Sequence, residues 1–130
     1  MADPRLTLAA GITGALNGGK KVKDKFVVVP DERSIATIDR RTVIVSLQGF
    51  EPLAAAPLSG LNVGFIVRVI SPLSNLIAAE GDAWDAATDV AFAIETIPGV
   101  TYIRAKKVLH ADRYLAYDLE VEADAKKKEV

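Results

Sequence analysis

The feature that most constrains the fold is a set of segments in which apolar residues alternate with other residues. In 61–70, LNVGFIVRVI, one side of an extended chain would carry Leu61, Val63, Phe65, Val67 and Val69. Successive side chains of a strand point to opposite faces, so this alternation predicts a strand with one face in a core. Segments 42–50 and 114–122 alternate in the same way. A sheet must therefore form the centre of the molecule.

Two helices are predicted beside these strands. Asp3 and Pro4 are typical of a helix start, Leu8, Ile12 and Leu16 recur at intervals of four, and Asn17-Gly18-Gly19 ends the segment. A longer helix is predicted over 74–97, with Trp84, Ala87, Ala91 and Ile94 in one apolar stripe.

The start of the longer helix is less simple. Ser74 or Asp82 would cap it. Glu80 would project from the apolar side of an unbroken helix, so the spacing predicts a kink at Gly81 or a start near Asp82.

The remaining segments complete an α+β pattern. A short strand is predicted at 26–29 and a longer one at 100–109, with a turn over 110–113 before the last strand. The order is helix, strand, strand, strand, helix, strand, strand. We expect a single domain over residues 1–123, in which two helices pack on a mostly antiparallel sheet of about five strands, and a charged tail over 124–130.

Composition argues against most catalytic chemistry. The chain has no cysteine, which excludes disulfides, thiol nucleophiles and cysteine metal sites. Its one histidine, His110, lies near Asp112 in a predicted turn. Because the sequence suggests no nucleophile that this pair could activate, we interpret His110 as a solvated residue. Asn17-Gly18-Gly19-Lys20-Lys21 follows a helix and precedes a strand, unlike a phosphate-binding loop. We predict no catalytic, cofactor or metal site and no enzyme activity.

Net charge and hydropathy limit the kinds of partner that we expect the chain to bind. A formal charge of −1 gives no overall field for holding nucleic acid, so specific DNA reading is not expected. No apolar stretch reaches the roughly 20 residues needed to span a bilayer. Asp3 precedes Arg5 at the N-terminus, which is unlike a signal peptide, so a soluble protein without a membrane partner is expected.

Charge is distributed unevenly along the chain. Residues 51–100 contain six acidic residues and one basic residue, whereas the first fifty contain eight basic and five acidic. Such asymmetry favours head-to-tail association, although ordinary surface charge is the alternative. The candidate basic contact is Lys20, Lys21, Lys23 and Lys25. The weakly charged loop 51–60 is a candidate interface, through Glu51, Pro52, Leu53, Pro57 and Leu58.

The layout, the helix ending IPGV and the final strand YLAYDLEVEA together resemble the tail terminator proteins of long-tailed phages, especially those of actinobacterial hosts. The resemblance covers nearly the whole chain. It implies a homohexameric ring that caps the tail tube, binds the tube protein and the head connector or stopper, and lets DNA pass through its bore without specific contacts. It also implies a structural protein of the virion, located at the head–tail junction and assembled in the host cytoplasm.

The resemblance offers a role for two acidic sets and leaves rivals open. An acidic bore would repel DNA, so the lumen or a subunit contact would be formed by Asp82, Asp85 and Asp89 or by Asp118, Glu120 and Glu122. One rival is another junction protein, a stopper, an adaptor or a tail-tube-like protein. A rival of a different class is a small dimeric ligand-binding module or enzyme, for which the predicted interior offers few polar groups beyond Glu80 and Arg68.

Overall fold

The α+β order expected from the sequence is confirmed. A computed structural model describes residues 4–17, 26–29, 38, 40–52, 60–73 and 75–126. Its elements are α1 (Pro4–Asn17), β1 (Val27–Val29), β2 (Thr42–Pro52), β3 (Gly60–Ile70), α2 (Leu76–Glu95), β4 (Val100–His110) and β5 (Tyr114–Lys126). The predicted tail begins inside β5, because residues 124–126 pair with Gly60–Asn62; residues 127–130 lie outside the described part.

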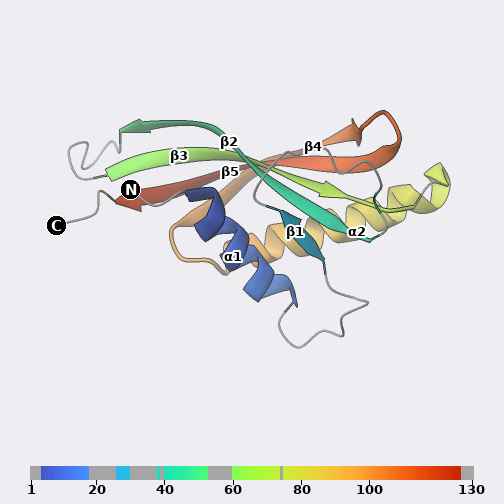
Figure 1. The fold of residues 1–130 in the computed structure, drawn as a ribbon, viewed down its shortest axis with the longest axis horizontal. Coiled ribbons are helices and arrows are strands. Elements are labelled where there is room, and N and C mark those ends of the chain that lie inside the picture. Colours follow the sequence, from blue (N-terminus) through green and yellow to red (C-terminus); the bar gives the residue numbers. More distant parts are fainter. Residues whose placement is uncertain are drawn as a thin grey trace.

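The sheet has the strand order β1-β2-β3-β5-β4. β1 runs parallel to β2, and the other neighbouring strands are antiparallel. Both helices lie on one face of this sheet, with α2 running along it and α1 beside the short β1 (Figure 1). No described helix covers the opposite face, which we call the open face; a second, smaller cluster of buried residues lies at one end of it and is formed by Ile38, Ile44, Ile70, Tyr114 and Ala116.

The core lies between the sheet and α2. Alternating residues of the central strands, including Phe65, Val67 and Leu119, are fully buried there. The facing stripe of α2 consists mostly of alanines and is formed by Ala79, Ala83, Ala86, Ala87, Val90, Ala93 and Ile94. Such short side chains let the helix axis approach the sheet closely, and the larger strand residues fill the space. Ala87 and Ile94 are buried as predicted, whereas Trp84 is 59% exposed and does not belong to the core.

The longer helix is continuous, so the predicted kink or late start was wrong. Asn75 caps it, and its Oδ1 accepts hydrogen bonds from the backbone N–H groups of Ile77 and Ala78. The conflict over Glu80 disappears because the buried stripe is rotated away from Trp84. Glu80 instead points to β4, where its carboxylate accepts a hydrogen bond from Lys107 Nζ at 2.8 Å.

The first helix, α1, is held in place by apolar packing along its length and by two hydrogen bonds at its end. Leu8, Ile12 and Leu16 are buried as the spacing predicted. Gly11 gives room to Ile97, because a Cβ on Gly11 would lie 3.1 Å from its side chain. At the helix end, Asn17 donates to the carbonyl of Phe26 and accepts from its N–H, both at 2.9 Å. This pair fixes the start of β1 against α1.

The β4–β5 hairpin closes through a turn that strains two residues. Ala111 and Asp112 have φ values of 52° and 57°, and Arg113 N–H donates to the carbonyl of His110 at 3.1 Å. Two positive φ angles in succession suit the twist of a hairpin but disfavour residues that carry a Cβ.

Replacing Ala111 by glycine should therefore stabilise the protein. We expect Ala111→Gly to raise the free energy of unfolding by about 1 kcal/mol, because glycine adopts this conformation without steric cost. Urea denaturation of the variant and the wild type measures the change. An unchanged or lowered unfolding free energy would show that the turn is not strained in solution.

Candidate functional site

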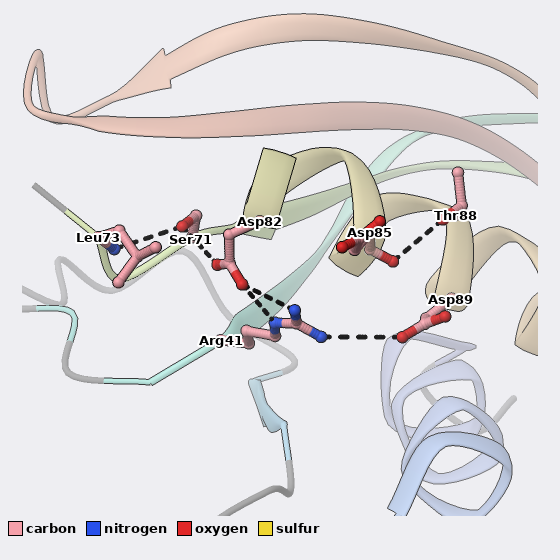
Figure 2. A network of polar contacts seen from close by, with 7 residues as sticks. All are labelled: Arg41, Ser71, Leu73, Asp82, Asp85, Thr88 and Asp89. Carbon is pink, nitrogen blue, oxygen red and sulfur yellow. Dashed lines mark hydrogen bonds and ion pairs between the residues drawn. The ribbon is translucent and has the colours of Figure 1, made fainter. Parts of the chain in front are cut away.

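Arg41, just before β2, is the centre of a polar network that reaches three elements (Figure 2). Its Nε and Nη2 donate to Asp82 Oδ1 at 3.1 and 2.7 Å, and its Nη1 lies 3.8 Å from Asp89 Oδ2. The guanidinium also stands over the ring of Phe26, 5.6 Å from its centroid. The network therefore joins α2 to the start of β2 and to the residue before β1.

Asp82 is satisfied on both of its oxygens. Oδ2 accepts a hydrogen bond of 2.6 Å from the hydroxyl of Ser71, which is completely buried at the end of β3. The same hydroxyl accepts the N–H of Leu73 at 3.3 Å. Asp82 therefore links α2 to the end of β3, and its charge is balanced inside the chain.

The three aspartates of α2 consequently differ, although the sequence suggested one acidic set. Asp82 is 19% exposed and paired, Asp89 is half exposed at the edge of the network, and Asp85 is exposed. Figure 2 shows Asp85 away from Arg41 on the next part of the helix; its backbone carbonyl accepts from Thr88. Asp85 is thus the member most available to a partner.

These environments predict that two similar substitutions on α2 change the free energy of unfolding by different amounts. We expect Asp82→Ala to lower the free energy of unfolding by about 2 kcal/mol, because Arg41 and the buried Ser71 hydroxyl lose a charged partner. Asp85→Ala, on the same helix, should change it by less than about 0.5 kcal/mol. Urea denaturation compares the two variants. Equal losses would mean that the Arg41 network does not stabilise the fold.

The second acidic set lies on the open face of the sheet, along β5. Asp118 receives two hydrogen bonds from Arg68, at 2.7 and 3.0 Å, and Glu120 is 2.7 Å from Arg104. Glu122 is half-buried and lines a shallow hollow of about 200 Å³ formed by Gln48, Gly49, Phe50, Glu51, Asn62, Gly64 and Glu122. Two of the three acidic residues are therefore neutralised by strand neighbours.

His110 is the first residue of the 110–113 turn, as predicted, but it is half-buried rather than solvated. It ends β4, and its Nδ1 lies 3.4 Å from Arg68 Nη1; the residue beside it is Arg68 rather than Asp112. Burial, and then the charge of Arg68, lowers the pKa of His110, while Asp118 opposes the shift. The protonated form of the imidazole is therefore disfavoured beside this arginine–carboxylate pair.

This lowered pKa predicts a pH dependence of stability. The unfolded chain binds a proton to His110 more readily than the folded chain, so stability should fall as pH decreases from about 7 to about 5.5. We expect His110→Gln to remove most of this fall, since the chain has one histidine. Thermal denaturation across that pH range tests it. A slope that persists in the variant would assign the effect to another group.

The other sequence-derived sites are only partly placed. Glu51 is exposed in β2, and Pro52 ends that strand. Leu53, Pro57 and Leu58, and the basic residues Lys20, Lys21, Lys23 and Lys25, lie outside the described residues. Within the described ranges, no three His, Asp or Glu residues gather as metal ligands. No helix in the same ranges is long and apolar enough to cross a bilayer.

An apolar stripe on the solvent side of α2 was not predicted from the sequence. Ile77 is 89% exposed and Phe92 67% exposed, with Trp84 between them. At 100° per residue the three side chains fall within about 80° of arc, so they form one stripe. Trp84 was assigned to the core because it is large and apolar. The signal of a second, buried stripe was the helical spacing of small residues at Ala79, Ala83, Ala86, Val90 and Ala93.

The comparisons with known proteins assign no family to this chain. No protein-family model matches it, and no curated protein matches it either.

Proposed function

We propose that the protein is a structural assembly subunit, a phage tail terminator that forms a ring on the tail tube, joins the tail to the head connector and lets DNA through its bore. The observation that carries the proposal is the exposed stripe of Ile77, Trp84 and Phe92 on α2. Large apolar groups aligned on one surface are typical of protein–protein contact sites. Burying them between subunits would remove this apolar surface from water.

Two further features support an assembly role. The described hollow is shallow and open, unlike the deep, enclosed cavities that hold small molecules. Four charged residues of the open sheet face form two ion pairs, Arg68–Asp118 and Arg104–Glu120. They therefore support structure rather than acid–base chemistry. The remaining support is the resemblance in layout and in the final strand.

The proposal predicts a defined assembly. Purified protein should form rings of six, and these should bind one end of purified tail tubes and stop their growth. Mass photometry and negative-stain microscopy measure ring size and end binding. A monomer or dimer at all concentrations, with tubes present, would contradict the proposal.

The same experiment distinguishes a tail terminator from the other head–tail junction proteins. A stopper or adaptor would bind the head connector and leave tube ends free, whereas a tube-like protein would polymerise into tubes by itself. An Asp85→Lys variant keeps the Arg41 network intact, so it alters the acidic surface of α2 without disturbing the fold.

A further inference from the structure

The helix α2 contributes only acidic residues to the borders of its apolar stripe, and one of them, Glu80, is already paired with Lys107 of β4 in the same chain. Glu80 lies on one side of Ile77, Trp84 and Phe92, and Asp85 lies on the other. The whole helix, Leu76–Glu95, contains no lysine or arginine. Two copies meeting stripe to stripe would therefore bring like charges together, which disfavours a symmetric contact through α2.

A surface of the opposite character lies at the edge of the sheet. β4 is the outermost strand beyond β5, and its exposed residues include the apolar Ile103 and Leu109 and the basic Arg104, Lys106 and Lys107. Arg104 and Lys107 are paired with Glu120 and Glu80 of the same chain, so Lys106 is the basic residue of this strand that is left for a partner. Arginine and lysine on an edge strand discourage the addition of another strand. A partner would therefore contact the apolar and basic side chains of this edge strand rather than pair with its backbone.

The two surfaces also match in length. The stripe from Ile77 to Phe92 covers 15 steps along a helix, which is about 22 Å. From Ile103 to Leu109 is six steps along a strand, or about 20 Å. The helix stripe thus has the length to lie along the edge strand, with exposed Asp85 and Lys106 as the complementary charges.

We infer that the α2 stripe of one copy docks on the β4 edge of a second copy, so that subunits associate head to tail. Trp84 lies at the centre of the stripe and contacts Tyr117 of β5 edge to face, with ring centroids 6.4 Å apart. It becomes buried in the contact, while Asp85 faces Lys106 across the interface. The contact joins unlike surfaces, as a closed ring requires. This inference rests on the proposed ring and names the surfaces that build it.

Site-directed crosslinking tests the contact in a chain that has no cysteine of its own. Gly81→Cys places a thiol within the stripe, where an added Cβ meets nothing within 4 Å, and Ala105→Cys places one on the exposed edge strand. The two proteins, one with an affinity tag that changes its mass, are mixed and treated with a short bismaleimide. The expected product is the mixed dimer. Gly14→Cys is the matched control, because it is another exposed helical glycine with open space around it.

Charge-reversal variants and tryptophan fluorescence give a second test of the same contact. Asp85→Lys and Lys106→Glu should each weaken association about tenfold, and the double variant should restore it. The single tryptophan reports burial, so its emission should shift to the blue as wild-type protein associates. Each variant should keep the unfolding free energy of the wild type.

The outcomes separate this inference from the function on which it rests. Normal rings without the mixed crosslink, or with Gly81–Gly81 crosslinks, overturn the interface but leave the terminator proposal in place. The opposite result is the mixed crosslink and the charge rescue in a protein that forms an open chain, or a ring that does not bind tubes. That result supports the interface and overturns the proposed function. Failure of the double variant to restore association also overturns the interface.

Discussion

Close packing between the alanine stripe of α2 and the central strands controls the rest of the structure. Because this stripe is buried, the rotation of the helix about its axis is fixed, and so is the direction of every other side chain on it. Asp82 then faces Arg41, Glu80 faces Lys107, and Trp84 faces solvent. One hydrophobic contact thus determines which charges are neutralised within the chain and which surface is left for a partner.

The charged residues serve two purposes that the fold separates. Arg41, Asp82 and Ser71 connect three elements at the border of the core, where a lost partner leaves polar groups without hydrogen bonds. Arg68 and Asp118 perform the same role on the open sheet face. Asp85 has no such task, so it can change with the partner at little cost to stability. An acidic surface counted from sequence is therefore larger than the one that a partner meets.

The proposed function follows from this division. A chain whose ionic pairs are mostly internal and whose exposed side of α2 is apolar gains most by burying that side against another protein. In the proposed contact, the edge strand β4 is the counterpart on the same molecule, so identical copies would suffice for a directional contact. Ring formation of this kind agrees with the tail terminator layout and needs no catalytic residue.

The periodic patterns in the sequence were enough to predict the element order, the buried side of β3 and the core positions of α1, because burial alternates with a local period in strands and helices. The rotation of α2 was not predictable from them. Alanine and tryptophan are both apolar, and only the distance to the sheet shows that the helix face needs small residues and excludes Trp84. Long-range partners such as Arg41 with Asp82, or Arg68 with His110, also depend on how the strands are ordered in the sheet. That order is fixed by the packing of the whole chain, so no local pattern records it.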